Sequence, residues 1–300
     1  TAYEITYGDW SSDVCSSDLV LKRRNHSEDL KRHLDRLAKM HRCNVCDIDE
    51  DALRMFFATL SSKAPKTFNN HRGSVSQFFT WCKRQGYAEK TWGCISCIET
   101  KRKDDASIEA YTPDAVTAAL RAARRSLVPC LAIQAFAGLR SDEVRKLDWR
   151  DIKFENGEIE VAAFKAKTAS DRTAPITANL AAWLEDARQS SGPVWPHSRA
   201  YYNELLADAF DKAGVTQLEN GLRHSFISYR VKAINNKPQV ALESGNSVQM
   251  IDHHYRKSIS AKDAEAYFAI MPDAKPAKEK RQRKAKQPAN VVQLPKAKAA

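Results

Sequence analysis

A short β pattern near the middle of the chain constrains the fold most, because the segments on both sides of it have helical periodicity. Residues 152–154 lead into Asn156-Gly157, a pair that favours a two-residue hairpin turn. The run 159–161 alternates apolar and charged residues. A second turn around 168–171 leads into 173–176, whose proline suits an edge strand. The pattern predicts a three-stranded antiparallel sheet inserted between helices.

The first part of the chain, residues 20–98, is predicted to form a helical domain. Its clearest helix begins near Thr67 and ends at Gly86, where glycine is the favoured C-terminal residue. Four polar residues near the start of this helix are either a solvated face or phosphate contacts, and the sequence leaves both open. They are Asn69, Asn70, His71 and Arg72.

A second domain, residues 108–270, is predicted after a linker at 99–107 that lacks apolar residues and periodicity. Thr112 and Pro113 provide a helix start, with a cap residue followed by proline at the first position. Further helices are expected around 126–137, 179–188, 201–213, 222–232, 247–256 and 261–270. The fold class is therefore mainly α with a small antiparallel β-sheet (α+β).

Both ends of the chain are set apart from these domains. Residues 1–19 have neither helical nor strand periodicity and resemble a translated sequencing adapter, so we expect an artefact there, or else a disordered leader. Residues 271–300 hold nine Lys or Arg against two acids and are rich in Ala, Pro and Gln. We expect a disordered basic tail.

The charge of the chain favours a polyanionic partner. The formal net charge is +11, which suits double-stranded DNA. No apolar run approaches membrane-spanning length, and seven cysteines without a recognisable signal peptide suggest reduced thiols in the cytoplasm. The pairs Cys43/Cys46 and Cys94/Cys97 suggest zinc, but no further Cys or His completes a familiar spacing, so we expect no metal site.

Five residues in three local strings, together with one lysine that lies between the first two strings, carry the chemistry that the sequence predicts. The strings are GLRSDEVRKLDW (138–149), NGLRHSF (220–226) and GNSVQMIDHHY (245–255). Two arginines can hold a phosphodiester, a lysine can protonate a leaving oxygen and a tyrosine can attack phosphorus. The six candidates are Arg140, Lys167, Asn220, Arg223, Asn246 and Tyr255.

Local context supports these candidates unequally. Arg140 is expected just outside a helix capped by Ser141, where backbone N–H groups favour an anion. Lys167 is preferred at the second hairpin turn over Lys165, which lies two residues earlier. For the nucleophile, Tyr255 is preferred over Tyr267, whose surroundings resemble a packing face.

Arg223 is the second arm of the predicted phosphate clamp. Asn220 lies three residues before it and would share its helix face. Asn220 can donate a hydrogen bond but cannot exchange a proton near neutral pH.

The strings together resemble the tyrosine recombinase (phage integrase) family. The resemblance covers about residues 20–270 and implies a helical core-binding domain that clamps DNA, followed by an integrase-type catalytic domain. It implies supporting roles for Glu143 and His224. It also implies cleavage through a 3′-phosphotyrosyl link to Tyr255, no cofactor, and homotetramers on paired DNA sites in a nucleoid-associated protein. The chain departs from the family at Asn220 and Asn246, where relatives usually have His.

Two functions from different classes stay open at this point. One is an active site-specific recombinase or integrase of a mobile element. The other is a DNA-binding protein on the same scaffold with catalysis impaired or lost. We favour activity, because the four groups hardest to replace are all present. A type IB topoisomerase would share the chemistry, but the separate first domain and the short chain argue against it.

Overall fold

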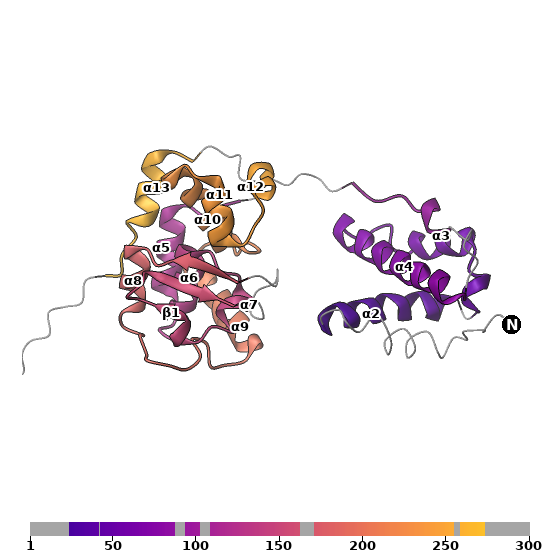
Figure 1. Ribbon diagram of the computed structural model, residues 1–300, viewed down its shortest axis with the longest axis horizontal. Coiled ribbons are helices and arrows are strands. Elements are labelled where there is room, and N and C mark those ends of the chain that lie inside the picture. The colour runs from indigo at the N-terminus through magenta and orange to yellow at the C-terminus, as the bar shows by residue number, and fades with distance from the viewer. Residues whose placement is uncertain are drawn as a thin grey trace, which may run out of the picture. The chain divides into compact units, whose positions relative to one another are not determined.

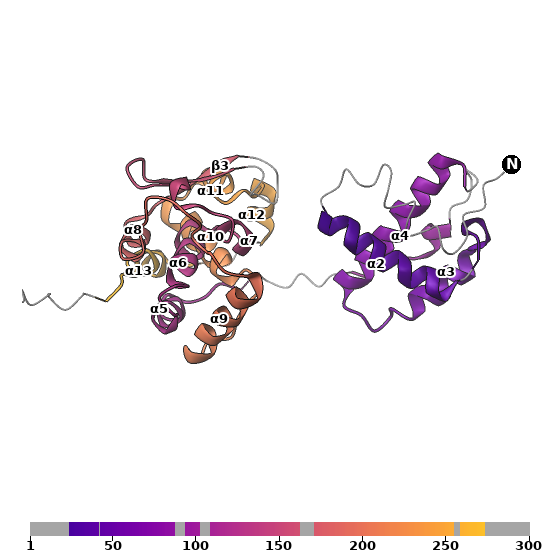
Figure 2. The ribbon, with the colours of Figure 1, turned by 90° about the horizontal axis from the view of Figure 1, so that it is seen from below.

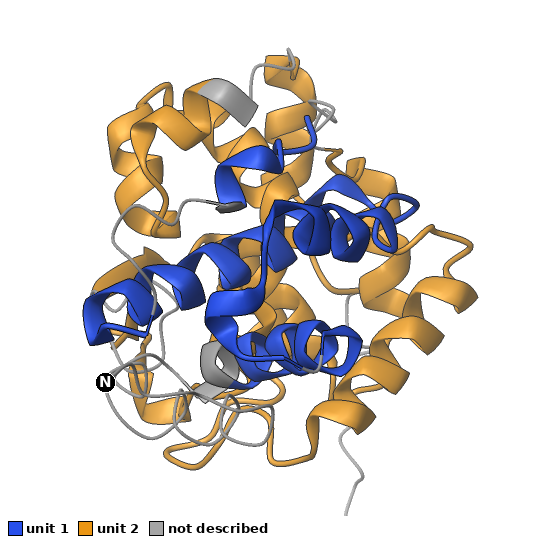
Figure 3. Ribbon diagram, turned by 90° about the vertical axis from the view of Figure 1, so that its right-hand side faces the viewer, with its two compact units in different colours: residues 1–106 blue, residues 107–300 orange. Residues whose placement is uncertain are grey.

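The computed structural model describes six stretches of the chain and divides it into two compact units. The described residues are 24–41, 43–87, 94–102, 109–162, 171–254 and 259–273. The units are Thr1–Ala106 and Ser107–Ala300, coloured separately in Figure 3. Within the described residues, no helix is long and apolar enough to cross a membrane, and no three His, Cys, Asp or Glu residues are grouped to hold a metal ion.

Unit 1 is a small helical bundle with its own apolar core. Its elements are α2 (Arg24–Met40), η1 (Val45–Asp47), α3 (Glu50–Ala58), α4 (Pro65–Gln85) and η2 (Cys94–Cys97). Phe56, Phe78 and Leu37 are among its fully buried side chains. Helix α4 starts two residues before the predicted position because a proline occupies its first turn, and Gly86 ends it with φ 81°.

Unit 2 combines many short helices with one small sheet (Figure 1). Its elements before the sheet are α5 (Pro113–Ala122), α6 (Val128–Ala137), α7 (Ser141–Val144) and η3 (Trp149–Asp151). The strands are β1 (Ile152–Lys153), β2 (Glu158–Val161) and β3 (Arg172–Pro175). The elements after the sheet are α8 (Ala178–Leu184), α9 (Arg199–Lys212), α10 (Gly221–Ile234), α11 (Lys237–Ser244), α12 (Val248–His254) and α13 (Ala261–Phe268).

Helix α6 forms the centre of unit 2. Every residue from Pro129 to Ala137 is buried, as expected of a helix that is apolar on all sides. It packs against α10 and α8, and α10 also packs against α13. These contacts place the end of α6, at Gly138, beside α10.

The sheet confirms the predicted three antiparallel strands in the order β1-β2-β3. Gly157 has φ 70° at the first turn, where glycine accepts the left-handed conformation without strain. Strand β3 is at the edge of the sheet and packs against α11 (Figure 2). The predicted second turn lies mostly in residues 163–170, outside the described residues.

Helix α11 is the element that the sequence analysis missed. Its start and stop signals are nevertheless present, because Asn236 caps it through Gln239 N–H and Gly245 ends it with φ 63°. The segment was overlooked because eight residues give too little periodicity to distinguish a helix from a loop. This short helix organises the candidate site.

Candidate active site

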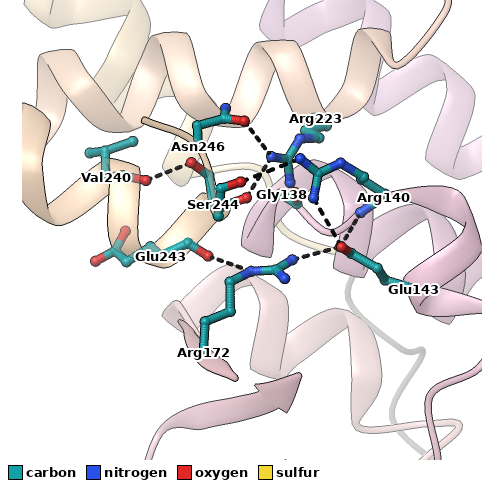
Figure 4. Close-up of polar contacts among 10 residues, drawn as sticks. Gly138, Arg140, Glu143, Arg172, Arg223, Val240, Glu243, Ser244 and Asn246 are labelled. Carbon is teal, nitrogen blue, oxygen red and sulfur yellow. Dashed lines mark hydrogen bonds and ion pairs between the residues drawn. The ribbon is translucent and has the colours of Figure 1, made fainter. Parts of the chain in front are cut away.

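Three consecutive carbonyls at the end of α11 each accept a hydrogen bond from a different arginine (Figure 4). Arg172 Nε donates to the carbonyl of residue 243 at 3.3 Å, and Arg140 Nη2 donates to that of residue 245 at 3.3 Å. Arg223 Nη2 donates to the carbonyl between them. The last carbonyls of a helix lack partners within the helix and carry partial negative charge, so guanidinium groups suit them. The arginines come from β3, the residue before α7, and α10, and meet at one helix end.

Glu143 binds both the backbone and the side chain of Arg140. Its backbone N–H donates to Glu143 Oε2 at 2.9 Å, and its Nη1 donates to Glu143 Oε1 at 3.0 Å. Arg140 itself, and not Ser141 as predicted, occupies the cap position before α7. Because α7 is a single turn of four residues, its dipole adds little to anion binding. The hydrogen bonds to Glu143 and to the carbonyl of residue 245 therefore orient the Arg140 guanidinium.

Glu143 lies buried between two arginines, with 1% of its side chain exposed. Arg172 Nη2 donates to Glu143 Oε2 at 2.6 Å. Burial alone raises the pKa of Glu143, but the hydrogen bond and charge of Arg172, followed by those of Arg140, outweigh it and lower the pKa. The carboxylate is therefore ionised and joins the two guanidiniums.

Arg223 connects the two arginine strings that the sequence analysis identified. Only 4% of the residue is exposed, and its Nη1 donates to the carbonyl of Gly138 at 2.5 Å. Gly138 has φ 69°, and a Cβ at that position would collide with the ring of Phe226. The glycine of the first string and the phenylalanine of the second thus require each other.

The two asparagines occupy different environments. Asn246 accepts a hydrogen bond from Arg223 Nη2 through Oδ1 at 3.1 Å, which turns its NH2 group away from that arginine (Figure 4). Asn220 lies just before α10 with φ 56°, so it does not share a helix face with Arg223 as predicted. Asparagine tolerates this left-handed conformation better than most residues do. The Asn220 side chain does not cap the helix, so it is not tied to the backbone there.

The two groups predicted to react with DNA lie outside the described part of the chain. Lys167, its competitor Lys165 and the nucleophile candidate Tyr255 lie outside the described residues. Helix α12 ends at His254, one residue before Tyr255. His224, predicted as a supporting residue, is partly buried on α10. Its role stays a prediction.

The competing tyrosine, Tyr267, is a packing residue. It is fully buried, and its hydroxyl donates to the carbonyl of Ala135 at 2.6 Å. Its ring stacks on Tyr229 at 4.1 Å between centroids. Burial, and then the neighbouring Tyr229, raise its pKa well above the ordinary value. A nucleophile needs the opposite shift.

Two of the four polar residues predicted to contact DNA in unit 1 have backbone partners within residues 95–101 of that unit. Asn69 Nδ2 donates to the carbonyl of Lys101 at 2.8 Å and Oδ1 accepts from its N–H at 2.9 Å. Arg72 Nε donates to the carbonyl of Ile98 at 2.5 Å. These contacts favour a structural role for Asn69 and Arg72, which anchor the segment before the linker.

Neighbouring positions on α4 differ from these two. His71 is buried, and its ring lies 3.8 Å from that of His33 between centroids. Asn70 is exposed and remains the member of the four that is free to reach a partner surface. DNA contact by these residues stays a prediction.

Arg172 is the site residue that sequence reasoning missed as a candidate. A signal was available, because an arginine that follows a predicted turn and precedes an edge proline is expected on a strand, five residues after Lys167 in the sequence. What could not be read from the sequence is its long-range partner, since Glu143 lies 29 residues earlier.

Comparison with known proteins gives a family match and a fold match. Residues 112–262 match the model of the phage integrase family. A lambda integrase dimer bound to a COC′ core site has a TM-score of 0.69 at 13% identity, with 86% of this chain and 81% of that chain covered. The Tn1549 transposon integrase in complex with a circular intermediate DNA has a TM-score of 0.64 at 14% identity, covering 88% and 98%.

A third solved structure shares the fold. XerH site-specific recombinase bound to palindromic difH substrate has a TM-score of 0.60 at 16% identity, covering 76% of this chain and 74% of that chain. Among the sequences of curated proteins, none matches this chain.

Proposed function

This chain belongs to the phage integrase family and is a tyrosine-type site-specific DNA recombinase, and we propose that Arg140 and Arg223 hold the scissile phosphodiester while Tyr255 attacks it. The observation that carries this assignment is the convergence of Arg140, Arg223 and Glu143 beside the end of α11. Residue 255 follows α12 by one position, and α12 packs against α11. The nucleophile candidate is therefore close in sequence to the helix pair that organises the arginines.

The reaction exchanges one phosphoester bond for another. The Tyr255 hydroxyl releases its proton to solvent as its oxygen bonds to phosphorus, and the bond from phosphorus to the 5′-oxygen breaks, which leaves a 3′-phosphotyrosyl link. Lys167 gives its proton to the departing 5′-oxygen. A free 5′-hydroxyl of another strand then reverses both steps. Bond numbers and types are unchanged, so no external energy source is needed.

The two guanidiniums stabilise the charge that grows on the non-bridging oxygens. Arginine suits this task because its planar fork keeps its charge and directs several donors. The NH2 groups of Asn220 and Asn246 add neutral donors where family members usually have His. Neither amide transfers a proton, so proton transfer rests on Lys167 and Tyr255.

The partner in this proposal is double-stranded DNA with a second copy of the chain bound to it. The lambda integrase structures include a dimer on a core site and a tetramer on a Holliday junction. We propose a homotetramer on paired sites for this chain. Unit 1 would clamp the DNA as a core-binding domain, with Asn70 at its surface.

Covalent capture tests the proposal. The probe is a library of nicked duplexes with randomised sequence on both sides of the nick, and the readout is an SDS-resistant protein–DNA adduct. We expect an adduct with the parent chain and with Tyr267→Phe, and none with Tyr255→Phe. Binding without an adduct would favour a DNA-binding protein with lost catalysis, and an adduct that survives Tyr255→Phe would exclude the assigned nucleophile.

A further inference from the structure

Arg172 has the burial and the partners of a site residue. Only 6% of its side chain is exposed. It donates to Glu143 at 2.6 Å and to the carbonyl of Glu243 at 3.3 Å. The Arg172 side chain therefore connects the Glu143 carboxylate, which holds Arg140, with the end of α11. The carbonyls at that helix end accept hydrogen bonds from the other two arginines.

The close packing of Gly245 ties Arg172 to the same helix end. A Cβ at Gly245 would lie 3.1–3.2 Å from Cδ, Nε and Cζ of Arg172. The carbonyl of Gly245 accepts from Arg140. Arg172 therefore packs against Gly245, whose carbonyl orients Arg140. It also contacts the Glu143 carboxylate, which orients Arg140 as well.

The charges of the cluster suggest why an arginine stands at 172. Glu143 is ionised and close to Arg140, so by itself it would cancel much of the positive charge that Arg140 presents to a phosphate. Arg172 supplies a second cation to the same carboxylate. With Arg223, three guanidiniums and one carboxylate leave two positive charges in excess. That excess matches the two negative charges of a pentavalent phosphoryl transition state.

A purely structural role explains the position less well. Burying a guanidinium requires desolvation, and apolar side chains of similar size often stabilise a fold as well as a buried ion pair does. In the part of the chain that the structure describes, Arg172 Nη1 is buried without a hydrogen-bond acceptor. An unsatisfied buried donor destabilises the folded state, because its hydrogen bond to water is lost on folding and not replaced. A role in fold stability alone therefore does not explain why an arginine, and not an apolar side chain, is buried at this position.

We propose that Arg172 is a positioning residue for the phosphate clamp, which fixes Glu143 and the end of α11 so that Arg140 faces the phosphodiester with its charge intact. The inference rests on the proposed function, since it assigns Arg140 to the scissile phosphate. Arg172 acts through Glu143 and Gly245 and does not itself touch DNA.

A charge-deleted substrate tests this role. In a methylphosphonate, a neutral methyl group replaces one non-bridging oxygen at the scissile position, so cleavage depends less on guanidinium charge. The duplex is the sequence recovered by covalent capture with the parent chain, and each phosphorus stereoisomer is measured separately. The variants are Arg172→Met and Arg172→Lys, with Arg230→Met as the matched control.

Arg230 is a suitable control because it is a partly buried arginine of the same corner. Its Nε and Nη2 donate to the Glu243 carboxylate at 3.0 Å each, and neither bond involves Glu143 or Arg140. The substitution Arg230→Met therefore removes an ion pair between α10 and α11 without changing the charge beside Arg140.

We expect Arg172→Met to slow single-turnover cleavage of the phosphodiester by about 10–100-fold at saturating DNA, below the loss typical of removing a direct donor. On the methylphosphonate its defect should shrink to less than about 3-fold, since the missing charge matters less there. Arg172→Lys should fall between parent and Arg172→Met. Arg230→Met should give the same ratio to parent on both substrates. An Arg172→Met defect of equal size on both substrates, or no defect, would overturn the inference.

A second measurement is independent of cleavage. Thermal unfolding of Glu143→Gln, Arg172→Met and the double variant forms a double-mutant cycle. We expect the double variant to unfold at a temperature no lower than Arg172→Met alone, because Arg172→Met leaves a buried carboxylate with one partner fewer. Additive losses would refute the coupling between Arg172 and Glu143 whatever the cleavage result. If the parent forms no adduct, the proposed function fails, and the cycle still decides whether Arg172 and Glu143 act together.

Discussion

Arg72 in unit 1 and Arg223 in unit 2 look alike locally, and their difference shows what distinguishes a site. Both donate to backbone carbonyls of their own unit. The partners of Arg72 all lie in one segment, at Ile95 and Ile98. Those of Arg223 lie on two elements, beside two more arginines and a buried carboxylate. Carbonyl contacts alone therefore indicate anchoring, whereas convergence of several cations from separate elements indicates a place for an anion.

The largest effect should come from a matched pair of substitutions in these two arginines. Arg223→Lys should slow single-turnover cleavage by about 10³-fold or more, because one ammonium cannot bridge two carbonyls and still face a phosphate. Arg72→Lys should lower the unfolding temperature of unit 1 and change the cleavage rate at saturating DNA by less than about 3-fold. Equal losses of cleavage in the two variants would break the distinction between anchor and site.

The lysine assignment can be tested by changing the leaving atom. Lys167→Ala should slow cleavage by about 10²–10⁴-fold, as loss of a general acid does. Replacing the leaving 5′-oxygen with sulfur should restore most of the rate, because a thiolate leaves without a proton. Lys165→Ala is the matched control and should be near the parent rate on both substrates. Rescue of Lys165→Ala instead would transfer the role to Lys165.

Glu143 should matter less than the arginines that it holds. Glu143→Gln keeps the shape but removes the charge, so cleavage should slow by about 10–100-fold. The lowered pKa also predicts a stability effect: ion pairs of Glu143 are complete above the ordinary carboxyl pKa of 4.5 and are lost as pH falls through the lowered value. Acid unfolding of the parent should therefore contain a step that Glu143→Gln lacks. Identical acid profiles would contradict an ionised, doubly paired carboxylate.

Asn220 separates side-chain function from backbone conformation. Asn220→Gly keeps the left-handed φ of 56° without a side chain, whereas Asn220→Ala adds about 1–2 kcal/mol of backbone strain. If the amide donates to phosphate, Asn220→Gly should slow cleavage by about 10-fold and Asn220→His should be tolerated. A parental rate for Asn220→Gly would place this side chain outside the site.

The smallest effect is a pH dependence confined to unit 1. Burial, then the charges of His71 and Arg32, lower the pKa of His33 from 6.5 to about 4, while Asp29 opposes the shift. The unfolded chain therefore binds a proton that the folded chain does not, so stability is full above pH 6.5 and falls as pH drops towards 4. Between pH 7 and pH 5 the loss should be about 1–2 kcal/mol.

His33→Gln is the control for this pH effect. It should flatten the dependence of the unfolding free energy of unit 1 between pH 7 and pH 5 while leaving single-turnover cleavage at pH 7 unchanged. A dependence that persists in His33→Gln would assign the titration to another group of unit 1.

The sequence predicted the elements that carry strong local signals. The Asn156-Gly157 turn, the edge position of Pro175 and the glycine ends at Gly86 and Gly138 are each determined within a few residues. The sheet was predicted because β periodicity stands out between helical segments. These features need no knowledge of distant contacts.

The parts that were missed depend on contacts far apart in the chain. Arg172 is recognisable as a site residue only through Glu143 and the end of α11. The sequence left the role of Asn69 and Arg72 open between a solvated face and phosphate contact, because the residues they hold, Lys101 and Ile98, lie 32 and 26 positions away in the chain. Local pattern shows which residues have reactive chemistry, but the fold decides which of them meet.

The most direct test of the account is to locate the covalent bond. The captured adduct would be digested with trypsin and nuclease, and the peptide that carries the residual nucleotide identified by mass spectrometry. We expect a nucleotide attached to Tyr255, in the peptide that ends at Arg256. A nucleotide on Tyr267 or any other residue would contradict the assigned site, and so would release of cleaved DNA with no attached protein.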